Sequence, residues 1–114
     1  MPRDYNVYLD DIIEAVRKIR AFTAGMPLDD VPQDAKTFDA VIRNLEVIGE
    51  AVKHLPDDMR RREPEVDWRK IASLRDVLIH EYFGIDAEVV NDIIQHKLSG
   101  LEAAVQRLLI PPAP

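Results

Sequence analysis

The sequence contains no cysteine. This absence excludes disulfide bonds, thiolate zinc sites and cysteine nucleophiles, and it fits a reducing compartment. Long apolar runs are also missing, since no stretch approaches the roughly 18 residues that a membrane span needs. The first residues, MPRDYNVYLDD, hold no apolar stretch that could act as a signal peptide. We therefore expect a cytoplasmic protein that has no membrane segment.

The motifs of several common enzyme classes are absent as well. The sequence has no GxGxxG or GKS/T phosphate loop, no GxSxG nucleophile elbow and no HExxH. His54 and His96 are not part of any pattern with metal-ligand spacing. The sequence therefore predicts no metal site and no cofactor, and it gives no support to a phosphate-loop protein or a serine hydrolase.

No segment alternates polar and apolar residues with the period of two that is typical of a strand. Apolar residues instead recur every three or four positions, which predicts helices over about 4–23, 38–55, 68–82 and 86–108. Asp67 and Asp86 are suited to cap the last two helices, and Gly84 ends the third. The connection PDDMRRREPEVD between the second and third helices has room for one further helical turn. The sequence thus predicts an all-α bundle of four or five helices.

The chain has 114 residues, of which 46% are apolar, and this suits a single domain. We expect the helical domain over residues 1–110 and a proline-rich tail over residues 111–114. The first two helices carry more apolar surface than a monomer of this length easily covers, which favours a homodimer.

Charge is distributed unevenly along the chain. The formal net charge of −6 argues against a protein that coats nucleic acid non-specifically, because Lys and Arg carry most of the affinity for phosphate. Residues 60–75, however, hold six basic and three acidic residues, whereas residues 76–114 hold two and six. The only basic segment therefore leads into the candidate site described next, although a solvated charged turn would have the same composition.

One group of side chains on the third predicted helix could carry chemistry. Asp76 and His80 are four residues apart and therefore neighbours on one helical face, away from the apolar arc. A carboxylate one turn from an imidazole can fix its tautomer, so the pair is a candidate general acid or base. Arg75 supplies a permanent two-pronged donor suited to phosphate. Together these groups could cleave RNA without a metal, but on spacing alone an Asp, a His and an Arg on a polar helix face are more often simply solvated.

The string RDVLIHEY, from Arg75 to Tyr82, resembles the Arg-x4-His-x-Tyr signature of the HepT-like toxins in the HEPN superfamily of helical ribonucleases. RNLEVIGEAVKHLP at 43–56 and PEVDWRKIASLRDVLIHEYFGID at 64–86 are similar to two further blocks of that family. The resemblance covers about two-thirds of the chain in the expected order. Asn91 departs from it, because many relatives carry a Trp there.

The resemblance implies an HEPN-like fold and an endoribonuclease whose active groups are Arg75 and His80, with Asp76 beside them. It also implies a homodimer in which both copies of the motif face one cleft. The usual partner is a nucleotidyltransferase antitoxin of the MntA type, which silences the toxin by attaching AMP to the motif tyrosine, here Tyr82. Without the resemblance, Tyr82 would be interpreted as an aromatic residue at the edge of the core.

We therefore predict a metal-independent endoribonuclease toxin of a toxin–antitoxin pair, with RNA as its substrate. The alternative is a non-catalytic helical module that pairs with a nucleotidyltransferase and uses its Arg and His only to contact phosphate. RNA cleavage products distinguish the two, because a binding module needs only to form a complex.

Overall fold

The computed structural model describes residues 4–74 and 87–109. These residues form α1 (Tyr5–Thr23), the 3-10 helix η1 (Leu28–Gln33), α2 (Ala35–Lys53), α3 (Asp57–Arg61), α4 (Trp68–Ala72), α6 (Ala87–Asp92), the π-helix η3 (Ile93–Lys97) and α7 (Leu98–Leu109). No strand occurs among them. The prediction of an all-α helical bundle is confirmed.

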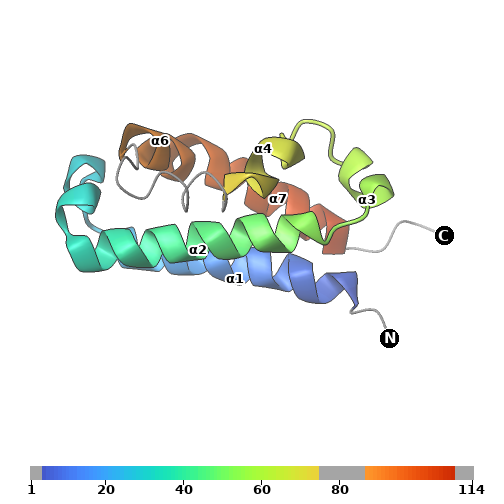
Figure 1. The fold of residues 1–114 in the computed structure, drawn as a ribbon, viewed down its shortest axis with the longest axis horizontal. Coiled ribbons are helices and arrows are strands. Elements are labelled where there is room, and N and C mark those ends of the chain that lie inside the picture. The colour runs from blue at the N-terminus through green and yellow to red at the C-terminus, as the bar shows by residue number, and fades with distance from the viewer. Residues whose placement is uncertain (1–3, 75–86, 110–114) are drawn as a thin grey trace.

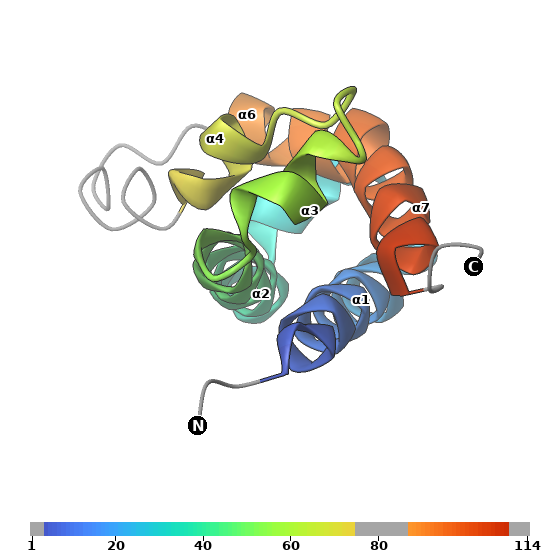
Figure 2. The same cartoon turned by 90° about the vertical axis from the view of Figure 1, so that its right-hand side faces the viewer.

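The long helices α1 and α2 form an antiparallel pair along the length of the molecule (Figure 1). Seen along that axis, α1 lies between α2 and α7, while α4 and α6 lie across from it (Figure 2). α4 packs against α2, and η3 continues directly into α7. The segment that precedes residue 75 and the segment that follows residue 86 are therefore both held on this helical frame.

Short acidic side chains cap the starts of the first two long helices. A side-chain oxygen of Asp4 accepts a hydrogen bond from the backbone N–H of Asn6 at 2.9 Å, and Asp34 accepts one from Thr37 at 3.1 Å. These bonds satisfy N–H groups that have no partner in the first turn of a helix. Gly25 follows α1 with φ +75°, a left-handed conformation that favours glycine over residues with a side chain. The first two predicted helices thus begin and end within a few residues of the observed ones.

A single apolar core joins the three long helices. Its fully buried side chains come from one face each of α1, α2 and α7, together with residues of η1 and α6 (Leu9, Ile12, Val16, Ile19, Val31, Val41, Leu45, Ile48, Val52, Val90 and Leu98). Burying one such Leu or Ile side chain contributes about 1.5–3 kcal/mol. At the rim, Arg20 of α1 donates hydrogen bonds to Glu102 at 2.5 Å and to Ser99 at 3.0 Å, both on α7.

The two aromatic residues at the ends of α1 are not part of the core. Tyr5 and Phe22, in the first and last turns of α1, are 42% and 44% exposed, whereas Leu9 and Ile19 between them are fully buried. The apolar stripe of α1 therefore buries its middle, and its two aromatic ends contact solvent.

Two of the predicted helices are interrupted. The third was expected to run from Trp68 to about Tyr82, but α4 ends at Ala72 with Ser73 as its C-cap. The hydroxyl of Ser73 donates to the carbonyl of Lys70 at 2.7 Å, and this local bond competes with the regular helical pattern. The rest of that prediction lies outside the described residues, as does the expected cap Asp86. The last helix contains a π-helical turn over Ile93–Lys97 that the periodicity does not reveal.

Candidate active site

The four residues expected to carry or regulate the chemistry, Arg75, Asp76, His80 and Tyr82, lie outside the residues that the structure describes. The structure does describe the elements on either side of them. α4 leads towards Arg75 and α6 begins at Ala87. These elements form the frame around the motif, and their contacts determine how the chain enters and leaves it.

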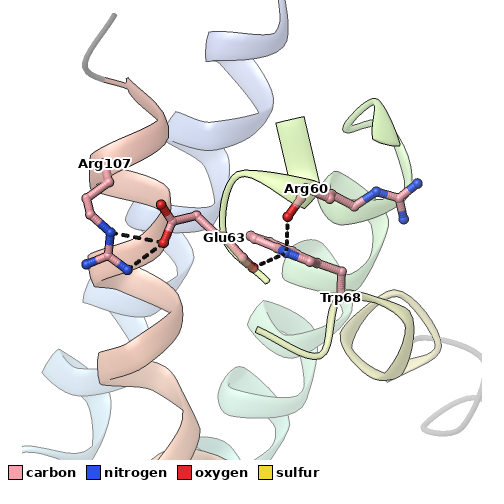
Figure 3. Close-up of polar contacts among 4 residues, drawn as sticks. All are labelled: Arg60, Glu63, Trp68 and Arg107. Carbon is pink, nitrogen blue, oxygen red and sulfur yellow. Dashed lines mark hydrogen bonds and ion pairs between the residues drawn. The ribbon is translucent and has the colours of Figure 1, made fainter. Parts of the chain in front are cut away.

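Trp68, the only tryptophan of the chain, anchors the segment before the motif. Its side chain is buried, and its indole N–H donates to the carbonyl oxygens of Arg60 at 3.1 Å and Glu63 at 3.0 Å (Figure 3). A buried indole N–H normally has an acceptor, and here it closes the turn between α3 and α4. Asp67 then caps α4 by accepting from the backbone N–H of Lys70 at 3.1 Å, as predicted.

A second contact fixes the same turn to α7. Both Nε and Nη2 of Arg107 donate to Oε1 of Glu63, at 2.9 Å and 2.5 Å (Figure 3). The hydrogen bond from Arg107 lowers the pKa of the Glu63 carboxyl, and the same bond raises the pKa of Arg107. The turn that leads into α4 is thus tied to the last helix.

Basic side chains line the approach to the motif. Arg61, Arg62, Arg69 and Lys70 are exposed, and their side chains make no hydrogen bond or ion pair with any residue that the structure describes. Arg60 differs, because its guanidinium pairs with Asp57. Asp57, Asp58, Glu65 and Asp67 lie in the same region and partly offset this positive charge. Arg62 also attracts the Glu63 carboxylate through its charge, and Arg61, Arg69 and Lys70 could contact phosphate groups without breaking a hydrogen bond or ion pair to a described residue.

The two described histidines have different surroundings. The ring of His54 stacks on that of Tyr8 with centroids 4.6 Å apart, and its Nε2 lies 3.6 Å from Oε1 of Glu50. His96 is exposed on η3. Over residues 4–74 and 87–109, no group of three or more His, Asp or Glu side chains could hold a metal ion.

The HepT-like ribonuclease model, described as "Ribonuclease HepT-like", matches residues 12–108. The chain belongs to this family. It is 43% identical over 108 residues to a Thermococcus cleftensis protein provisionally named ribonuclease HepT, covering 95% of this chain and 98% of that protein. It is also 50% identical over 99 residues to a Methanocaldococcus jannaschii protein provisionally named as an RNase. This match covers 86% of this chain and 82% of that protein. No solved structure matches the chain.

Membership of the HepT-like family confirms the resemblance inferred from the sequence blocks. The matched residues 12–108 include both the Arg43–Pro56 block, which forms most of α2, and positions 75–82. Within the described ranges, no helix has both the length and the apolar character needed to cross a membrane.

Two features of this frame have no signal in the sequence. The ion pair between Glu63 and Arg107 joins residues 44 positions apart. A pocket between α4 and η3 also forms only when the chain is folded, although its apolar floor consists of residues that the helical periodicity assigns to the core.

Proposed function

We propose that this HepT-like protein is a metal-independent endoribonuclease and acts as the toxin of a HepT/MntA-type toxin–antitoxin pair. The observation that carries the proposal is the family match over residues 12–108, which spans the Arg-x4-His-x-Tyr string. The provisional RNase names of the T. cleftensis and M. jannaschii relatives support the same activity.

In this mechanism His80 is the general acid or base and Arg75 stabilises the charge of the reacting phosphate. The ribose 2'-oxygen attacks the adjacent phosphorus and loses its proton, while the bond from phosphorus to the 5'-oxygen breaks and that oxygen gains a proton. The products are a 2',3'-cyclic phosphate and a 5'-hydroxyl end. Asp76, one turn from His80, would act as a positioning residue by orienting the imidazole.

The basic side chains on the approach to the motif support an RNA substrate. Arg61, Arg62, Arg69 and Lys70 are exposed and precede Arg75 by 5 to 14 positions in the sequence. Phosphate contacts of this kind fix the position of a nucleic acid strand without reading its sequence. They would bring the strand towards the motif.

Assembly and regulation complete the proposal. A single motif supplies one Arg and one His, so we assign the cleft to a homodimer in which two copies face each other. The nucleotidyltransferase antitoxin would transfer AMP from ATP to the Tyr82 oxygen, forming an oxygen–phosphorus bond and releasing pyrophosphate. The added phosphate would pair with Arg75 and His80 and keep the RNA backbone out.

The deciding experiment incubates the purified protein with total cellular RNA in EDTA. We expect cleavage with 2',3'-cyclic phosphate ends, and a decrease of about a hundredfold or more for His80→Ala and for Arg75→Ala. His54→Gln and Arg43→Ala are matched controls because both residues are exposed and lie outside the motif in the sequence. Activity that disappears in EDTA, or a His80→Ala protein that cuts normally, would contradict the mechanism. A protein that binds its nucleotidyltransferase but leaves RNA intact would be the non-catalytic module instead.

A further inference from the structure

A pocket of about 350 Å³ lies between α4 on one side and α6, η3 and α7 on the other. Its floor is apolar and its deepest residues are fully or nearly fully buried (Leu45, Ile48, Leu98 and Leu101). Ile71 and Leu74 complete the floor from the segment that begins with α4. The volume is within the usual range of sites for small organic ligands.

The rim of the pocket is charged and exposed. Lys70 on α4 faces a region lined by His96 and Lys97 of η3, and Glu65, Asp67 and Asp92 supply carboxylates. In the described part of the chain, the side chains of Asp92, His96 and Lys97 make no hydrogen bond or ion pair. Three of the lining residues belong to the π-helical turn, a feature often found at functional sites. Asp67 accepts from the backbone N–H of Lys70, whereas Asp92, His96 and Lys97 surround the apolar slot without being paired to one another.

The pocket also adjoins both ends of the segment that carries the motif. Leu74, which lines it, immediately precedes Arg75, and Val89 on its other wall lies three residues after Asp86. A ligand group in the pocket would therefore be close in the chain to the residues proposed to act on phosphate.

We propose that this pocket binds the base of one RNA nucleotide next to the bond that is cut, an inference that rests on the proposed function. The aliphatic floor would cover the faces of a flat ring and exclude water from it. Carboxylates on the rim accept hydrogen bonds from the amino groups of bases, and the lysines contact phosphate as point charges. A purely apolar ligand would leave the charged rim without partners, and a polyanion would be repelled by its three carboxylates.

The rim chemistry also sets a preference among bases. Adenine, cytosine and guanine each present an exocyclic amino group, which can donate a hydrogen bond to the carboxylate of Asp92 or Glu65. Uracil presents one N–H between two carbonyl oxygens, and a carboxylate repels these oxygens. We therefore assign the pocket a preference for amino-bearing bases over uracil.

Gly100 provides a direct test. It lines the pocket from α7, and a Cβ built on it meets no atom within 4 Å. Gly100→Phe would place a ring in the pocket mouth, whereas Gly100→Ala adds only one methyl group in open space and is the matched control. Circular dichroism melting curves of both variants establish that they are folded.

The probes are AMP, CMP, UMP and ribose 5-phosphate, titrated into the unmodified protein and followed by NMR. We expect AMP and CMP to bind about tenfold or more tightly than ribose 5-phosphate, as expected for one good base contact. Gly100→Phe should abolish this binding and Gly100→Ala should retain it. Asp92→Asn should reduce the preference for CMP over UMP.

Two results would overturn the inference. Equal affinity for ribose 5-phosphate and AMP would show that the rim holds only the phosphate, and AMP binding by folded Gly100→Phe would place the base elsewhere. If the protein cleaves RNA but binds no nucleotide, the pocket assignment fails and the proposed function stands. If nucleotides bind as expected and RNA remains intact, the pocket stands and the ribonuclease proposal fails.

Discussion

Glu63, in the turn between α3 and α4, and Arg107, on α7, form an ion pair in which two guanidinium nitrogens donate to a single carboxylate oxygen. The pair closes a loop of 44 residues that includes the proposed catalytic segment. Its members have unequal environments, because the Glu63 side chain is 15% exposed and that of Arg107 is 60% exposed. The contact is therefore open to solvent on the side of the arginine and depends on both pH and ionic strength.

Replacement of this carboxylate should lower the melting temperature at neutral pH. The pKa of Glu63 is lower in the folded protein than in the unfolded chain, because Arg107 stabilises the ionised form. The stabilisation is therefore fully present above the unfolded value of about 4.3 and is lost as the pH falls through the folded pKa. We expect Glu63→Gln to melt below the wild type at pH 7, with the difference narrowing towards pH 3. Arg43→Gln, an exposed α2 variant, is the control, and a constant difference at all pH values would contradict the explanation.

The indole N–H of Trp68 should also contribute to stability. Without it, the carbonyl oxygens of Arg60 and Glu63 keep only their bonds from backbone N–H groups, so the loss is the net contribution of a typical hydrogen bond, about 0.5–1.5 kcal/mol. We expect Trp68→Phe to lower the free energy of unfolding by that amount, measured by urea titration and circular dichroism. Benzothienylalanine at position 68 keeps the bicyclic shape and removes only the donor, so it separates the hydrogen bonds from the packing. If that analogue were as stable as the wild type, the two bonds would contribute nothing.

The proposed dimer predicts a molecular mass of twice 13.0 kDa in light scattering at micromolar concentration. Because the chain has no cysteine, a single introduced one reports on the interface without background. We expect Glu81→Cys to form a disulfide between protomers on oxidation, since the two motif segments would face each other in the proposed dimer, and Glu14→Cys on α1 to remain monomeric on a denaturing gel. A light-scattering mass equal to one chain would refute the shared cleft. So would a dimer in which the Glu81→Cys variant forms no disulfide between protomers.

Regulation by AMP transfer predicts that the hydroxyl oxygen of Tyr82 is the single acceptor of AMP. With its nucleotidyltransferase and ATP, the protein should gain mass in multiples of one adenylate unit and lose RNA cleavage. Tyr82→Phe removes that oxygen, so the variant should fold, resist modification and remain toxic when the partner is co-expressed. Tyr5→Phe and Tyr8→Phe should still be modified and silenced. Adenylate mapped to Tyr5 or Tyr8 by mass spectrometry would show that the modification site is elsewhere.

Local signals in the sequence are sufficient for most of the fold. The sequence predicts that Asp67 marks a helix start because a short carboxylate side chain satisfies free N–H groups, and it forms the expected bond; Asp34, which the prediction does not single out, does the same for α2. The central apolar residues of α1 and α2 are buried because their spacing matches the helical repeat. The caps and the apolar face of each helix are determined by residues close together in the chain, so the pattern of residue types reveals them.

Other features give no distinct signal in the pattern of residue types. The end of α4 at Ala72 follows from a side-chain bond of Ser73, yet Ser is compatible with a continuing helix in the repeat. The π-helical turn keeps apolar residues on the buried side for a few positions, just as an α-helix would. The residues of the candidate active site were identified by their motif and family, and their roles stay predictions.

The π-helical turn over Ile93–Lys97 lies between α6 and α7. The number of residues in this turn determines how α6 is rotated relative to α7. Each residue of an α-helix turns the chain by about 100°, and a π-helical turn contains one residue more than an α-helical turn. Removing one residue here would restore a regular helix and rotate α6 by about that angle relative to the core face of α7. Val90, now fully buried, would swing away from the core, and the chain would leave residue 87 in a new direction. The one extra residue of the π-helical turn thus determines the rotation of α6, and with it the direction from which the segment with the proposed catalytic histidine joins this helix.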